Sequence, residues 1–219
     1  MHATLCICTL IPRLTPRTRV AVVLHHREAR KPTNTGQFAA RCLERSSVTI
    51  IGERDHPYDL PPIGDHELPL VLFPDDDAQP IASYRGSPRP IVLFVPDGTW
   101  RQASKLPRRI AALSALPRVT LPDAGRTAYQ LRSEVREGGL ATFEAIARAL
   151  AVLEGDAGPA IEQAMTAVFR IMVDRTLWLR GALPDRDVTG GVPPAAIAGN
   201  PRSSRANRSP ALAAHRQGT

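Results

Sequence analysis

The fold is decided by Ile91-Val-Leu-Phe-Val95, which is followed directly by Pro96-Asp97-Gly98-Thr99-Trp100-Arg101-Gln102. Five apolar residues, mostly β-branched or aromatic, predict a buried strand, and Pro-Asp-Gly is typical of a turn. Ligands of open α/β sheets bind beyond the carboxyl ends of the strands. Asp97, Thr99, Trp100 and Arg101 therefore lie where a functional site is expected.

A purely structural explanation covers part of the same stretch. Pro-Asp-Gly accounts for Asp97 as a turn residue, and Thr99 with Gln102 fits a capping box at the start of a helix. Neither pattern explains Trp100 and Arg101 in the first helical turn beside an acidic residue. The residues alone leave both interpretations open.

On both sides of this stretch, short apolar strands alternate with amphipathic segments. We expect further strands over 20–24, 48–51, 68–73 and 119–121, and helices over 35–44, 100–113, 143–153 and 161–179. Strands that alternate with helices predict an α/β fold with a mostly parallel sheet flanked by helices.

The composition changes near residue 184. From there, Gly, Pro, Ser, Arg and Ala dominate without an apolar period, which predicts a disordered tail over 185–219 after a domain over 1–184. This tail carries five arginines against two aspartates. It would either strengthen binding to RNA or be a dispensable extension.

The charge of the chain favours a polyanionic partner. The formal net charge is +7 over 219 residues, and only Lys31 and Lys105 among the basic residues are lysines. Arginine suits phosphate recognition because its planar fork binds two oxygens, although GC-rich coding would also enrich it. The apolar stretch over 3–12 lacks the preceding basic segment of a signal peptide. No apolar stretch in the sequence is long enough to span a membrane, so we expect a cytoplasmic protein.

Several segments together resemble the DTW-domain family. Asp97-Gly98-Thr99-Trp100 matches the Asp-x-Thr-Trp signature that names it, and Arg101-Gln102-Ala103 continues the match. Other elements occur in the family's order: Leu24-His25-His26-Arg27-Glu28, Thr33-Asn34-Thr35-Gly36, Leu72-Phe73-Pro74, Tyr129-Gln130-Leu131-Arg132 and Leu140-Ala141-Thr142-Phe143-Glu144-Ala145. The resemblance covers roughly residues 5–180.

The resemblance implies a SPOUT-like fold, whose C-terminal half forms a trefoil knot and cradles S-adenosylmethionine. It implies an enzyme that transfers the 3-amino-3-carboxypropyl group of S-adenosylmethionine to N3 of a tRNA uridine and releases methylthioadenosine. Two alternatives remain: a SPOUT-type RNA methyltransferase, and a catalytically silent tRNA-binding protein on the same fold.

The resemblance also suggests roles for single residues. Asp97, Thr99 and Trp100 would be catalytic, with Asp97 as the general base for the uracil N3 proton and Trp100 as a stacking surface. Arg101 and Arg132 would hold a tRNA phosphate or the methionine carboxylate. The cofactor-binding residues would be Leu72, Phe73, Pro74, Leu140, Thr142 and Glu144. For Thr142 and Glu144, an N-cap and an acidic residue favoured by the helix dipole are the structural alternative.

The cysteines give an incomplete metal pattern. Cys6 and Cys8 resemble the second half of the family's N-terminal zinc cluster, whose earlier Cys-x-x-Cys pair is absent from this sequence. Two thiolates do not complete a tetrahedral zinc site. Three explanations remain open: the sequence starts too late to include the first pair, the site is degenerate, or another residue such as His2 helps. Cys42 lies on an apolar helix face and is expected in the core.

Overall fold

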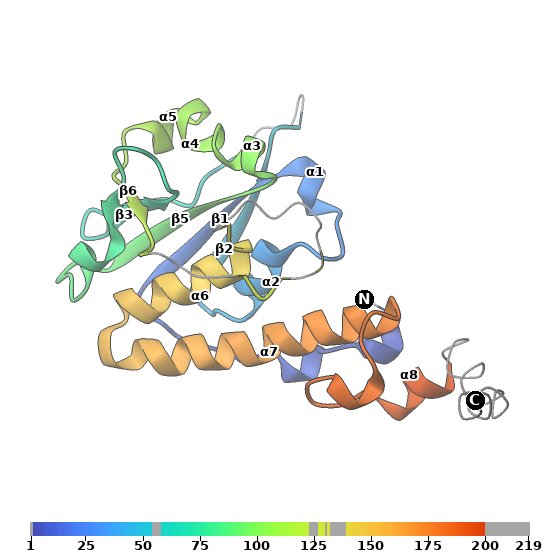
Figure 1. Cartoon of the computed structure of the whole chain (residues 1–219). Coiled ribbons are helices and arrows are strands. Elements are labelled where there is room, and N and C mark those ends of the chain that lie inside the picture. The colour runs from blue at the N-terminus through green and yellow to red at the C-terminus, as the bar shows by residue number, and fades with distance from the viewer. Residues whose placement is uncertain (1, 54–57, 123–126, 130, 132–138, 200–219) are drawn as a thin grey trace, which may run out of the picture. The chain divides into compact units, whose positions relative to one another are not determined.

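The computed structural model describes residues 2–53, 58–122, 127–129, 131 and 139–199 (Figure 1). The chain divides into two compact units, one formed by residues 10–169 and the other by residues 1–9 and 170–219. The larger unit contains the sheet and the expected site.

The sheet of the larger unit has six strands in the order β2-β1-β5-β3-β6-β4. The strands are β1 (Arg19–His25), β2 (Ser46–Ile51), β3 (Leu68–Leu72), β4 (Gln79–Pro80), β5 (Ile91–Asp97) and β6 (Arg118–Thr120). All neighbouring strands pair in parallel, as the sequence predicts for most of the sheet. Central strand β5 is buried along its whole length, because helices cover both faces.

Three short helices cover one face of the sheet: α3 (Trp100–Ala103), α4 (Leu106–Arg109) and α5 (Ala111–Ser114) (Figure 1). Their side chains pack on alternate strand residues in a buried cluster that includes Val23, Phe94, Leu106 and Leu113. The prediction of one helix over 100–113 is wrong. Pro107 lacks a backbone N–H, and its ring would clash with the preceding turn of a continuous helix.

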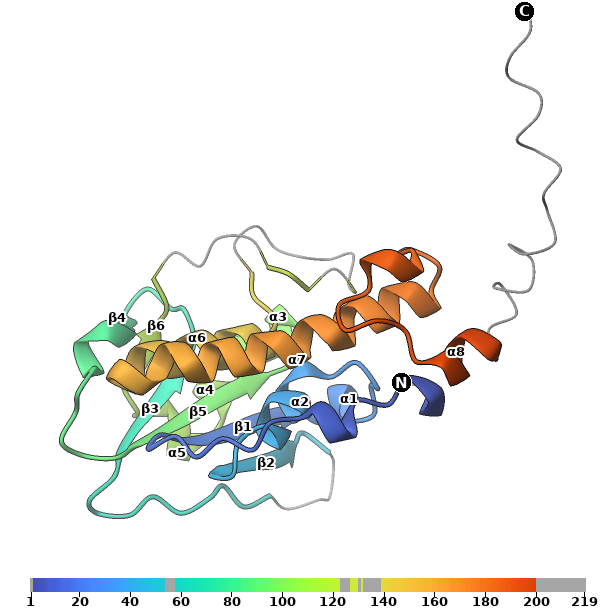
Figure 2. The same cartoon turned by 90° about the horizontal axis from the view of Figure 1, so that it is seen from below.

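Helices α2 (Thr35–Arg41) and α6 (Thr142–Leu153) cover the other face, and Figure 2 views the sheet from this side. Phe143 of α6 lies 4.9 Å from Phe38 and 4.6 Å from Phe169, measured between ring centroids. Phe169 belongs to α7 (Gly158–Leu179), which follows α6 after the 3-10 turn Gly155–Ala157. This aromatic stack joins α2, α6 and the first part of α7.

Neighbouring strands β1 and β5 send their connections to opposite faces. The chain leaves β1 through α1 (His26–Ala29) toward α2, whereas it leaves β5 through α3. Leu24 of β1 pairs with Asp97 of β5, so the two strands end side by side. Such a topological switch point is where open α/β sheets bind ligands.

The smaller unit has its own apolar cluster of Leu5, Trp178, Val188 and Ala196. Trp178 Nε1 donates to Asp185 Oδ1 at 2.6 Å. The expected disorder does not hold for residues 185–199, where Asp185–Asp187 form a 3-10 turn and Pro194–Ala198 form helix α8. Buried Val188 and Ala196 stabilise this segment by contacts that no local apolar period reveals. No helix in the described ranges is long and apolar enough to cross a membrane.

Candidate functional site at the ends of strands β1 and β5

Asp97 is the last residue of β5, and only 4% of its surface is exposed. Two side chains from distant parts of the chain hold its carboxylate. Asn34 Nδ2 donates to Oδ2 at 2.7 Å, and Thr142 Oγ1 donates to Oδ1 at 2.6 Å. Because each carboxyl oxygen has its own donor from a different helix start, this pair fixes the side chain of Asp97 in one orientation.

The start of α2 is built around the same carboxylate. Asn34 is the N-cap, and its Oδ1 accepts from Gln37 N at 2.8 Å while its amide nitrogen reaches Asp97. A Cβ at Gly36 would overlap with Asp97 Oδ2 and lie 3.1 Å from Val22 Cγ1. Only glycine allows this close approach, so the Asn-Thr-Gly segment presses the helix start against Asp97.

The start of α6 differs from the expected cap. Ala141 is the N-cap, and Thr142 is the first helical residue, so its hydroxyl is directed to Asp97 instead of the helix backbone. Glu144 Oε2 accepts from Ala141 N at 3.0 Å and from Thr127 Oγ1, while Oε1 accepts from Ala128 N at 2.8 Å. Glu144 thus connects the start of α6 to residues 127 and 128. An acidic residue favoured only by the helix dipole would not predict this connection.

The capping box after Asp97 is confirmed. Thr99 N donates to Gln102 Oε1 at 2.8 Å, and Gln102 N donates to Thr99 Oγ1 at 3.4 Å. Trp100 is 42% exposed, and its ring centroid lies 5.2 Å from that of buried Phe73. The segment after β3 and the segment after β5 therefore meet in an aromatic pair with one accessible ring.

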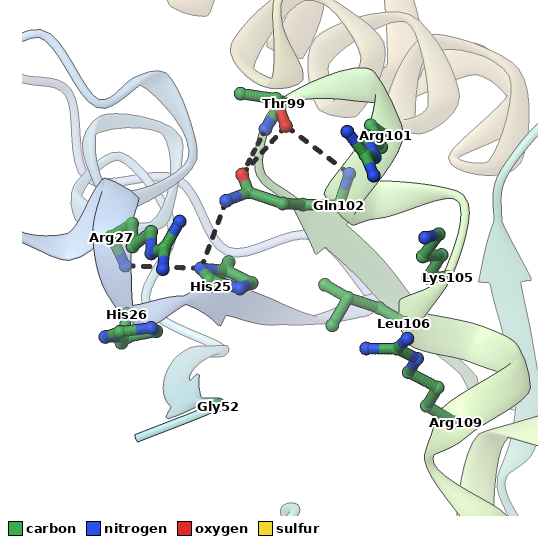
Figure 3. A pocket seen from close by; sticks show the side chains of 10 residues that line it. All are labelled: His25, His26, Arg27, Gly52, Thr99, Arg101, Gln102, Lys105, Leu106 and Arg109. Carbon is green, nitrogen blue, oxygen red and sulfur yellow. Dashed lines mark hydrogen bonds between the residues drawn. The ribbon is translucent and has the colours of Figure 1, made fainter. Parts of the chain in front are cut away.

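A hollow of about 580 Å³ opens beside this capping box (Figure 3). Figure 3 shows Arg27 and the two histidines on one side, and Arg101, Lys105 and Arg109 on the other. The complete lining is His25, His26, Arg27, Gly52, Thr99, Arg101, Gln102, Lys105, Leu106 and Arg109. None of these ten residues, all in the described part of the chain, is acidic.

His25 links the hollow to the capping box. Its Nδ1 faces the backbone N–H of Arg27 at 3.2 Å and the side-chain amide of Gln102 at 3.4 Å. Burial lowers the pKa of His25 below its ordinary value of 6.5, His26 and Arg27 lower it further, and Glu28 opposes them. Two donors directed at Nδ1 also favour a neutral ring with its proton on Nε2.

The other predicted residues are distributed as follows. Leu72 and Phe73 are buried at the end of β3, Pro74 is exposed, and Leu140 is half-buried before α6. Arg132 lies outside the described residues. Sequence reasoning assigned no role to Lys105 or Arg109 and no contact to Asn34. The cap position of Asn34 before the apolar face of α2 was the available signal.

The three cysteines differ in exposure. Cys6 and Cys8 are exposed, and Cys42 is buried. Among the residues that the structure describes, no group of three or more His, Cys, Asp or Glu side chains is placed to hold a metal ion. Cys42 lies in the core, as predicted.

Comparison with known families shows where the chain belongs. Residues 1–177 match the DTW domain, so the protein is a member of the DTW-domain family. Its relatives include tRNA-uridine aminocarboxypropyltransferase 2 of Drosophila melanogaster, 31% identical over 143 residues, or 63% of this chain and 57% of that protein.

Two further relatives carry the same kind of name. tRNA-uridine aminocarboxypropyltransferase A of Arabidopsis thaliana is 27% identical over 208 residues, covering 77% of this chain and 75% of that protein. tRNA-uridine aminocarboxypropyltransferase 2 of Macaca fascicularis is 26% identical over 157 residues, covering 68% of this chain and 53% of that protein. The matched region is thus little more than half of the Drosophila and macaque proteins. No solved structure matches the chain.

Proposed function

We propose that this protein transfers the 3-amino-3-carboxypropyl group of S-adenosylmethionine to N3 of a tRNA uridine and releases methylthioadenosine. The observation that carries the proposal is the fixed carboxylate of Asp97 at the switch point, within the matched DTW domain. The names of the relatives support the reaction and the tRNA substrate. We further propose a cytoplasmic location and the knotted SPOUT-like arrangement.

The residues near Asp97 fit a sulfonium co-substrate with an adenine base. The pair of Phe73 and Trp100 offers an aromatic surface, and we assign stacking on a base to the Trp100 ring, which is 42% exposed. Glu144 holds residues 127 and 128 beside the start of α6 through hydrogen bonds, so we assign it a positioning role. When bound, the co-substrate supplies the carbon that is attached to the sulfonium sulfur. The bond between this carbon and sulfur breaks as uracil N3 attacks the carbon.

We propose that Asp97 receives the proton that leaves uracil N3 during this attack. A general base must lie within hydrogen-bond reach of the proton that it accepts. The bonds from Asn34 and Thr142 hold the carboxylate in one place, so its orientation requires no reorganisation during the reaction. Thr99 acts indirectly, because its hydroxyl and backbone N–H are bonded to Gln102.

Asp97→Asn tests the base while preserving the shape of the side chain. The new amide can direct its oxygen to Asn34 and its NH₂ to the hydroxyl of Thr142, which can also accept, so the fold should survive. A lost general base lowers turnover by about 10²- to 10⁴-fold. We expect a drop of this size in single-turnover rate with tRNA binding unchanged; near-normal turnover would exclude the base role.

Mass spectrometry of tRNA incubated with the protein and S-adenosylmethionine tests the reaction itself. An aminocarboxypropyl adduct with released methylthioadenosine supports the proposal. A methyl adduct with S-adenosylhomocysteine would replace transfer of the aminocarboxypropyl group by methyl transfer. Absence of any product, despite tRNA binding, would favour the silent binding protein.

A further inference from the structure

Positive charge gathers in the hollow beside the capping box, and none of its ten described lining residues is acidic. Some basic side chains elsewhere in the larger unit form ion pairs: Arg19 with Glu67 at 2.6 Å, Lys31 with Glu28 at 2.6 Å, and Arg108 with Asp75 at 3.0 Å. Arg27, Arg101, Lys105 and Arg109 have no ion-pair partner within the described ranges, and all four line the hollow.

The arrangement of three of these cations follows from the chain. Arg101 belongs to α3, Arg109 to α4 and Lys105 to the turn between these helices, and all three are exposed. Figure 3 shows the three side chains one after another along one wall of the hollow. Like charges in such a row repel each other, and a bound anion would remove this repulsion.

We infer that this basic hollow binds the phosphodiester backbone of the RNA substrate, with Arg27 on one wall and the row of Arg101, Lys105 and Arg109 on the other (Figure 3). The inference rests on the proposed RNA substrate. A hollow of about 580 Å³ that is open to solvent suits a strand that enters and leaves. Trp100 precedes Arg101 in the chain and is 42% exposed, and exposed aromatic rings near basic side chains stack on bases in other single-strand binding sites.

The hollow is also correctly placed for the chemistry. Arg101 and Gln102 lie in α3, which begins shortly after Asp97 in the chain. His25 directly follows Leu24, which pairs with Asp97 in the sheet. A backbone held by Arg27 and Arg101 would therefore direct a nucleotide toward the ends of β1 and β5. The hollow would position RNA, whereas Asp97 would act on the base.

The test measures binding of unmodified tRNA to the full-length protein over a series of salt concentrations, without S-adenosylmethionine. The test variant combines Lys105→Gln and Arg109→Gln. The matched control combines Arg108→Gln and Arg85→Gln, which remove the same charge from exposed residues that do not line the hollow. Arg108 is especially suitable, because it neighbours Arg109 but is directed to Asp75.

Each lost phosphate contact reduces the slope of log affinity against log salt by about 0.7 to 0.9. We expect the test variant to lose about 1.5 units of slope, the control to keep the wild-type slope, and both to unfold at the wild-type temperature. An unchanged slope in the test variant, or an equal loss in both, overturns the inference. A separate titration of the test variant with S-adenosylmethionine also bears on the inference: loss of that binding with intact tRNA binding overturns it, because the hollow would then hold the small-molecule carboxylate.

The inference and the proposed function can fail separately. If hollow variants bind tRNA normally while wild-type protein modifies it, the RNA surface lies elsewhere and the reaction stands. If the slope depends on the hollow but no product forms with any tRNA pool, the RNA site stands and the reaction fails.

Discussion

At the residue scale, Asp97 is surrounded by three small or polar residues that each serve it differently. Asn34 and Thr142 donate to its two oxygens, and Gly36 leaves room for it against α2. The Asp-x-Thr-Trp segment and its capping box were predictable, because they depend on local spacing. The donors were not, because they lie 63 and 45 residues away in the sequence.

Gly36→Ala should destabilise the protein, although alanine is the better helix former. The added methyl would overlap with the Asp97 carboxylate and crowd Val22. Overpacking of a tight site costs about 1–3 kcal/mol, which exceeds the roughly 1 kcal/mol of helix propensity gained. Denaturant unfolding should show a lower midpoint, and turnover should fall because Asp97 is displaced.

Gly199→Ala is the control for Gly36→Ala. A Cβ at Gly199 would meet only Ala195 O, at 3.4 Å, in an ordinary backbone conformation. Its unfolding midpoint should stay close to that of the wild type. If Gly36→Ala were as stable and active as this control, the close approach of Gly36 to Asp97 would not be needed for folding or activity.

At the element scale, His25 joins β1, α1 and α3. It ends β1 and caps α1 by accepting from Arg27 N, and the same Nδ1 faces Gln102 in the capping box of α3. The sequence predicted a strand before His25, but not that the ring connects two helix starts. Such a connection depends on β1 and β5 being neighbours in the sheet.

Acidification should weaken the folded state through His25. Its folded pKa lies below the ordinary 6.5, so the unfolded chain binds this proton more readily. The contribution of neutral His25 to the free energy of unfolding is complete above the unfolded pKa. It decreases as pH falls from about 6.5 toward the pKa of the folded state. Between about pH 7.5 and 5.5, the wild type should lose more free energy of unfolding than His25→Asn, whose amide oxygen can still cap α1.

Two carboxylates with shifted pKa values, Glu67 and Asp75, do not obscure this comparison. The pKa values of Glu67 and Asp75 are lowered from 4.5 and 3.8, chiefly by hydrogen bonds from Arg19 and Arg108, so both groups remain ionised in this window. The other histidines are common to both proteins. Parallel losses in wild type and His25→Asn would show that His25 is not the responsible group.

At the scale of the whole molecule, the reactivity of the three cysteines measures how accessible each unit is to thiol reagents. Cys6 and Cys8 are exposed in the smaller unit, whereas Cys42 is fully buried in the larger one, and burial raises the pKa of its thiol to about 12. Because thiolates are the reactive form, Cys42 should resist thiol reagents until the larger unit unfolds.

A chromogenic disulfide titration with and without a metal chelator measures this difference. We expect two fast thiols in the native protein and the third only in denaturant. In Cys42→Ala, native and denatured protein should both show two. Rapid reaction of three native thiols would contradict the buried position of Cys42, and slow reaction of two thiols that the chelator accelerates would reveal bound metal at Cys6 and Cys8.

The sequence by itself determined the alternation of strands and helices, the turn and capping box after β5, and membership of the DTW family, because these depend on local order and spacing. It did not determine the breaks around Pro107 or the structure of residues 185–199, where packing decides. Only the tertiary structure brought Asn34 and Thr142 to Asp97, and Arg27 opposite Arg109. The physical reason is that the order of strands in the sheet decides which chain ends become neighbours, and no local pattern encodes that order.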